Sequence, residues 1–253
     1  MILRRVIDHV KAQNWFAVAI DFVIVVLGVF IGIQVANWNA ARADRKIEAQ
    51  YLARLQQELA EMAPQADAAV QASIKDNERI SQVRDYFMTG GNGGDFGGAH
   101  CAALARSHIF ADVIFYPPTI KELISTGRIV LIRDDALRTA ILAFDQVNAE
   151  ISQLRDDIQI DRLPLARKHP DLIRNGLVDW EGSVCDFPAM AANQSFINDF
   201  GDNRSRFAAY VAAVLERQAV LINVLGNKVA ASRGGVFTPE RANAGEPEGA
   251  RAP

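Results

Sequence analysis

The chain has 253 residues, half of them hydrophobic, and carries 27 Lys and Arg against 30 Asp and Glu, a formal charge of −3 at pH 7. This slightly acidic balance lacks the basic excess of a general nucleic-acid binder, so we expect no nucleic-acid partner. Two cysteines exclude a disulfide-rich scaffold and a four-cysteine zinc site.

Residues 1–13 predict a short amphipathic helix that lies on a membrane surface. One helical face is aliphatic and the basic residues lie elsewhere: Ile2, Leu3, Val6, Ile7 and Val10 against Arg4, Arg5 and Lys11.

Residues 15–38 predict a transmembrane helix. From Phe16 to Ala36 only Asp21 and Gln34 are polar, and a helix of this length is about 30 Å long, the thickness of a hydrocarbon core. Trp15 and Trp38 bracket the run at the two expected headgroup levels. A cleaved signal peptide is the alternative, but the helical pattern continues past the poor A-x-A site at residues 41–43. We expect a retained single-pass anchor in contact with the lipid bilayer.

One face of this helix carries small and polar residues. Asp21 lies between Gly28 and Gly32 on a helical wheel, and GVFIG is a small-xxx-small pair that lets two helices approach closely. A carboxyl group facing lipid costs about 2.5–3.5 kcal/mol at the helix centre, which favours an Asp21 that faces protein. We expect this face to bind a second copy of the chain or another membrane protein.

Residues 39–88 continue as one long helix or stalk with a heptad seam: Leu52, Leu55, Leu59, Met62, Ala66, Ala69, Ile80, Val83 and Phe87. A coiled-coil stalk and one helix of an intramolecular bundle both fit the seam, and later helices offer partners. Pro64 is expected to kink or interrupt the helix. Residues 89–98 contain six glycines without the GK[ST] ending of a phosphate-binding loop, which predicts a flexible linker.

Residues 99–232 predict a helical bundle, followed by a disordered tail at 233–253. Thr119 and Glu122 have capping-box spacing, so a helix is expected to start at Thr119 and to end at Gly127. Asp134 is expected to cap the next helix, which Pro164 ends. An irregular stretch, 164–187, and two helices, 188–200 and 203–231, complete the prediction. The expected buried residues are Leu137, Ile141, Phe144, Asn148, Ile151, Leu154, Ile158, Phe207, Val211, Val214, Leu221, Leu225 and Val229.

Two stretches, NWFAVAIDFVIVVLGVFIGIQVANWN and KELISTGRIVLIRDDALR, resemble the recurring signatures of a family of uncharacterised bacterial single-pass inner-membrane proteins. The signatures read NW-x-A-x-x-IDF-x-IVV-x-GVFIG-x-Q-x-x-NWN and EL-x-STGR-x-x-LIRD, and the likeness covers most of residues 1–145. The family has no assigned activity, so the resemblance transfers no site. It implies that Asp21, Gly28, Gly32 and the turn at 125–128 matter to the architecture.

Residues with chemical potential do not form a recognisable catalytic pattern. His100, His108 and Cys101 lack metal-ligand spacing, and no nucleophile motif is present, so we expect no catalytic residue, no metal and no cofactor. Arg128 and Arg133 bracket an apolar run, where local ion pairs or a partner or anion contact both explain them. Cys101 and Cys185 are candidates for a disulfide, and the sequence leaves their pairing open.

The sequence thus predicts an all-α protein: an amphipathic helix, one transmembrane helix, and an extramembrane antiparallel helical bundle. Loop charges do not decide the orientation, and the usual signal-anchor outcome places the N-terminus in the cytoplasm and the domain in the periplasm. The leading hypothesis is a non-enzymatic scaffold, sensor or accessory subunit that self-associates through its anchor. The alternatives are a small subunit of a proton-driven, stator-like complex using Asp21, and a periplasmic ligand-sensing module.

Overall fold

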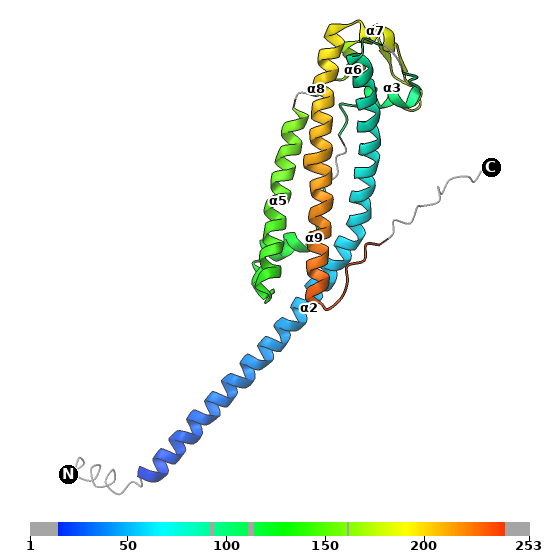
Figure 1. The fold of residues 1–253 in the computed structure, drawn as a ribbon. Helices are drawn as coiled ribbons and strands as arrows, with labels where there is room; N and C mark the ends of the chain where they lie inside the picture. The colour runs from blue at the N-terminus through cyan, green and yellow to red at the C-terminus, as the bar shows by residue number, and fades with distance from the viewer. Residues whose placement is uncertain (1–14, 92–93, 111–113, 161, 241–253) are drawn as a thin grey trace, which may run out of the picture. The chain divides into compact units, whose positions relative to one another are not determined.

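The computed structural model describes residues 15–91, 94–110, 114–160 and 162–240, and the predicted amphipathic helix at 1–13 lies outside this part. The described chain is mostly helical, with one small two-stranded sheet (Figure 1). It divides into two compact units, Met1–Gln50 and Tyr51–Pro253.

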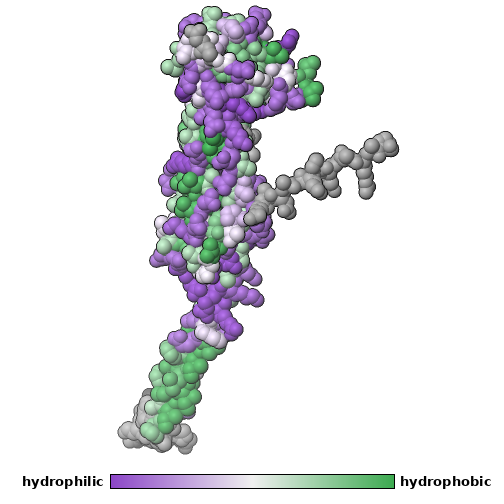
Figure 2. Space-filling view, turned by 45° about the vertical axis from the view of Figure 1, so that its right-hand side comes forward, coloured by the Kyte–Doolittle hydropathy of each residue, from purple (hydrophilic) through white to green (hydrophobic). Residues whose placement is uncertain are grey.

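The first unit is described from Trp15 and consists of the first part of helix α2, Trp15–Met88. Its apolar side chains are exposed, with between 41% and 73% of the surface of each large hydrophobic residue from Phe16 to Val35 accessible. In Figure 2 this segment forms a continuous hydrophobic surface. Such exposure of consecutive apolar residues is costly in water and is the pattern of a helix that lies in lipid.

The second unit contains the rest of α2, which Pro64 does not interrupt, and all remaining elements. These are α3 (Gly98–Ala105), α4 (Pro118–Ser125), the 3₁₀ turn η1 (Arg128–Leu131), α5 (Asp135–Gln159), α6 (Leu165–Lys168), β1 (Ile173–Arg174), β2 (Val184–Cys185), α7 (Phe187–Ala191), α8 (Gln194–Tyr210), the π-helical turn η2 (Val211–Glu216) and α9 (Arg217–Ser232).

Long helices run side by side in this unit. Figure 1 shows α5, α8, α9 and the later part of α2 next to one another, with α3, α6 and α7 gathered at one end. The heptad seam of α2 faces this core, because Leu55, Leu59, Ile80 and Val83 are fully buried. The later part of α2 therefore packs within its own chain, as the intramolecular interpretation of the seam expects.

Helix α5 follows from its sequence. Asp134 accepts hydrogen bonds from the backbone N–H groups of Ala136 and Leu137, which satisfies two of the free donors at the helix start. Gly127 has a φ of 70°, the left-handed conformation that glycine adopts at no steric cost. Every predicted inward residue of α5 is buried except Leu154, which is partly buried against the core.

The predicted capping box at Thr119 is wrong. Helix α4 begins at Pro118, and Pro117 at its cap position makes no side-chain cap bond. The hydroxyl of Thr119 donates to Glu58 and accepts from Arg54 instead. The Thr119 side chain therefore bonds to residues of α2 and does not cap α4, although its spacing from Glu122 predicts a cap.

The predicted helix boundary near residue 202 is also wrong. Helix α8 begins after Asn193, whose side chain caps it, and continues through Gly201. Asn203, the residue expected to start a new helix, is buried and joins two other segments: its amide exchanges hydrogen bonds with the backbone of Leu163 and donates to Ser107. The stretch expected to be irregular holds α6 and a β-hairpin in which Ile173 pairs with Cys185.

The beginning of the predicted disordered tail is ordered. Phe237 is buried, and the Glu240 N–H donates to the carbonyl of Ala60 at 2.9 Å. The phenyl ring occupies the space beside Gly226, where an added Cβ would lie 2.5 Å from a ring carbon. This segment therefore packs along α9 and reaches α2. The remainder of the predicted tail, 241–253, lies outside the described residues.

Candidate functional site

The predicted transmembrane face keeps an open surface. Asp21 and Trp38 are exposed on α2, and an added Cβ at Gly28 or Gly32 would meet no atom within 4 Å. Trp15 is the first residue of α2, and the Arg42 guanidinium lies 5.7 Å from the centre of the Trp38 ring. Packing inside the described chain does not require glycine at either position, so the two glycines leave room for an external helix.

The stretch KELISTGR, residues 121–128, contacts α2 through a polar network. Tyr51 donates to Glu122 at 2.7 Å and accepts from Arg128 at 2.7 Å. Arg54 forms an ion pair with Glu122. The tyrosine hydroxyl thus connects a cation and a carboxylate that both come from the KELISTGR stretch.

A second hydroxyl extends the network. Thr119 donates to Glu58 at 2.7 Å and accepts from Arg54 at 2.6 Å, and its backbone N–H also donates to Glu58. Hydrogen bonds from Tyr51 and then from Arg54 lower the pKa of Glu122. Charges in this network are therefore compensated within it, which makes it a structural joint between α2 and α4.

The structure separates the roles of the two candidate arginines. Arg128 belongs to the network through Tyr51. Arg133 is exposed, five residues further on and directly before the capping residue Asp134. Asp135 pairs with Arg138 at 2.5 Å. The contact of Arg128 is therefore not the local ion pair that the sequence suggested, because its partner is a hydroxyl group 77 positions away on α2.

Cys101 and Cys185 form a disulfide with a Cα–Cα distance of 5.6 Å. It joins α3 to strand β2 across 84 residues of sequence. Nearby, Asp199 of α8 binds the segment that ends α6, with 2.7 Å to Lys168 Nζ and 2.7 Å to His169 Nε2. Burial opposes ionisation of Asp199, but the hydrogen bonds from Lys168 and His169 outweigh it and lower its pKa. Both contacts hold this end of the helical unit together.

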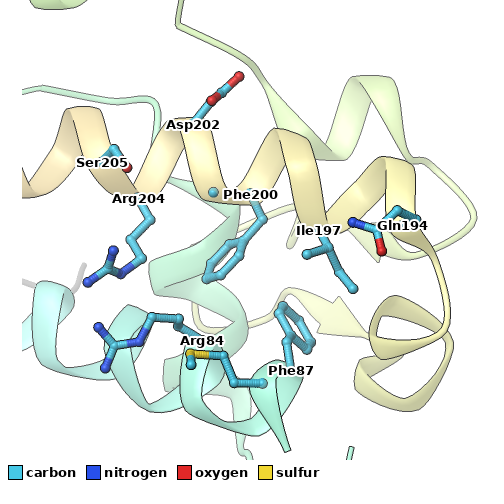
Figure 3. A pocket seen from close by; sticks show the side chains of 10 residues that line it. Arg84, Phe87, Gln194, Ile197, Phe200, Asp202, Arg204 and Ser205 are labelled. Carbon is cyan, nitrogen blue, oxygen red and sulfur yellow. The ribbon is translucent and has the colours of Figure 1, made fainter. Parts of the chain in front are cut away.

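A cavity of about 480 Å³ lies between the end of α2 and the first half of α8 (Figure 3). It is lined by Arg84, Phe87, Met88, Gln194, Ile197, Phe200, Gly201, Asp202, Arg204 and Ser205. Figure 3 shows the two guanidinium groups close together at one side, with Phe87, Ile197 and Phe200 beside them and Asp202 directed away. The volume lies within the range of small-molecule sites.

Sequence reasoning missed this cavity. Arg84 and Arg204 lie on different helices, and neither is part of a motif. The available signal was an arginine beside the aromatic seam residue Phe87, which is common on any amphipathic helix. Only the pairing of α2 with α8, seen in the contact of Phe87 with Phe200 at 5.2 Å between ring centres, brings the two arginines to one place.

Within the described residues, no group of three or more His, Cys, Asp or Glu side chains is arranged to hold a metal ion. Comparisons of the chain with protein families, curated proteins and solved structures found no match. Two helices of the described part are long and apolar enough to cross a membrane, within Val18–Met88 and Gln194–Ser232. The apolar window of the first has no buried residue, whereas 44% of the second window is buried.

Proposed function

We propose that this protein is a membrane-anchored helical scaffold, sensor or accessory subunit without catalytic activity. The observation that carries the proposal is the exposed apolar segment of α2 from Phe16 to Val35. It precedes a unit, Tyr51–Pro253, that has a hydrophobic core of its own. A single span supports a role in which the helical unit is held at a bilayer and acts by contact.

The buried fraction of each apolar helix decides which of the two we assign as the membrane span. Residues of α9 contribute to the core, since Ile222, Leu225 and Val229 are at most 2% exposed. A helix that supplies core residues is not free to enter lipid. We therefore assign the anchor to the predicted segment, 15–38, as a single pass of a bacterial inner membrane.

The disulfide supports the proposed compartment. Disulfides persist in the periplasm and are rare in the cytosol. With Cys101 bonded to Cys185, the orientation that fits is an N-terminus in the cytoplasm and a helical unit in the periplasm. In this orientation the anchor face of Asp21, Gly28 and Gly32 is available to a second copy of the chain.

The experiment tests which helix anchors the protein. The double variant Val26→Lys/Val29→Lys places two charges in the proposed span, each costing about 2.5–3.5 kcal/mol at the helix centre. We expect alkaline carbonate to release it from bacterial membranes while the wild type stays in the pellet. The matched control Val220→Lys/Val224→Lys changes exposed residues of α9 and should stay membrane-bound. Release of the control alone would refute the proposed anchor.

Orientation is tested separately in spheroplasts. Protease added from outside should digest the helical unit and leave an N-terminal tag intact. Thiol alkylation before and after reduction should show two cysteines that react only after reduction. A protected helical unit or freely reacting cysteines would contradict the periplasmic location.

A further inference from the structure

The cavity between α2 and α8 has a cationic side that lacks a complete set of protein partners. The Nε atom of Arg204 is buried, and no described residue forms a hydrogen bond with it. A buried donor without an acceptor is unfavourable, and more so when it belongs to a charged group. An acceptor bound in the cavity would remove this cost.

The second guanidinium is only partly compensated. Arg84 bonds to Asp85 on its own helix at 2.8 Å through Nε, and Asp85 is an exposed side chain. Asp202 is the only acidic residue among those lining the cavity, and it is directed away from the space (Figure 3). The charge facing the cavity is therefore positive but modest, because Asp85 offsets the charge of Arg84 while Asp202 is directed away.

The other side of the cavity is apolar. Phe87, Ile197 and Phe200 face the space from both helices in Figure 3. The rings of Phe87 and Phe200 meet edge to face, which leaves an aromatic wall next to the two guanidinium groups. Gln194 lines the far side and offers neutral hydrogen-bonding groups.

We propose that this cavity binds a small monocarboxylate with an apolar tail. Paired guanidinium groups match the two oxygens of a carboxylate. The aromatic wall takes the tail, and the modest net charge suits one negative charge better than the two of a phosphate monoester. This inference goes beyond the proposed function, because binding at the cavity does not depend on the anchor.

The test uses the full chain in lipid nanodiscs with 3-phenylpropanoate as the probe, followed by saturation-transfer NMR and titration. Empty nanodiscs supply the blank. We expect saturable binding, at least tenfold weaker for the neutral 3-phenylpropanamide and for acetate, which lack the charge and the tail respectively. Inorganic phosphate should not compete at equal concentration.

Substitutions of the two cavity arginines test whether the probe binds in this cavity. Arg204→Gln and Arg84→Gln should each weaken binding about tenfold, and Arg204→Lys should weaken it less because it keeps the charge. Arg217→Gln is the matched control, since Arg217 pairs with Glu150 away from the cavity. Circular dichroism verifies that each variant is folded. Equal binding by both cavity variants and the wild type, equal binding of the amide, displacement by phosphate, or no binding at all would overturn the proposal.

Discussion

Tyr51 donates its phenolic hydrogen to Glu122, with 2.7 Å between the oxygens, although the two residues are 71 positions apart. The bond attaches α4 to α2, and the same hydroxyl accepts from Arg128. Replacing Tyr51 by Phe removes a donor and an acceptor in one step. We expect the thermal midpoint of the helical unit to fall by a few degrees, measured by circular dichroism.

A double-mutant cycle controls this prediction. If the stabilisation comes from the Tyr51–Glu122 bond, Tyr51→Phe should have a smaller effect in a Glu122→Gln background than in the wild type. Additive effects of the two substitutions would show that the Tyr51 hydroxyl does not stabilise the protein through Glu122.

The stability of the helical unit should depend on pH through Asp199. Hydrogen bonds from Lys168 and His169 hold the folded-state pKa of Asp199 below its ordinary value near 4. A lowered folded pKa gives stability that is complete above the ordinary pKa and is lost as the pH falls through the folded value. Asp199→Asn should therefore lower the thermal midpoint by a few degrees at pH 7, and this difference should shrink below about pH 4. A difference that stays constant down to pH 2 would contradict the assignment.

Substitutions at Gly226 and Phe237 should have coupled effects on stability. Phe237→Ala removes a buried ring and is expected to cost about 3–5 kcal/mol of unfolding free energy, measured by denaturant titration. Gly226→Ala displaces the same ring and should also destabilise the protein. In the Phe237→Ala background the sign should reverse, because alanine favours a helix over glycine by about 1 kcal/mol when nothing occupies the space. Destabilisation in both backgrounds would mean that the ring is not the obstacle.

Self-association through the anchor predicts cross-links on one face only. Gly32→Cys in native membranes should form disulfide-linked dimers under mild oxidation, since the two native cysteines are already bonded to each other. Phe30→Cys, on the opposite side of the helix, is the matched control and should remain monomeric. Only monomer from Gly32→Cys, or equal dimer from both variants, would count against the proposed interface.

Local chemistry decided which parts of the fold could be predicted. The cap at Asp134, the left-handed Gly127 and the buried stripe of α5 depend on neighbours within one or two helical turns. Thr119 and Glu122 do not form a capping box, because their side chains bond to Arg54 and Glu58, which lie more than 60 residues away in the sequence. The spacing of residues in the sequence reveals possible hydrogen-bond partners nearby in the chain, but not partners that the fold brings in from another helix.

The cavity and the ordered C-terminal segment could not be predicted from the sequence, for related reasons. Arg84 and Arg204 line the same cavity only because of how α2 is aligned along α8, and the periodicity of the sequence does not specify this alignment. The composition after Gly234 is typical of disorder, yet a single residue, Phe237, finds a space that Gly226 leaves open. One aromatic side chain with a matching glycine outweighs an otherwise polar and flexible composition.

The hydrogen bond between the Glu240 N–H and the Ala60 carbonyl has a consequence for the order of events during synthesis. About 180 residues separate the two partners, and at about 5–20 residues per second the second is made roughly 10–40 s after the first. Until then, α2 lacks the contact that Glu240 makes at Ala60. Every newly made chain therefore passes through an interval in which the apolar segment from Phe16 to Val35 is complete but the C-terminal contact with α2 has not formed.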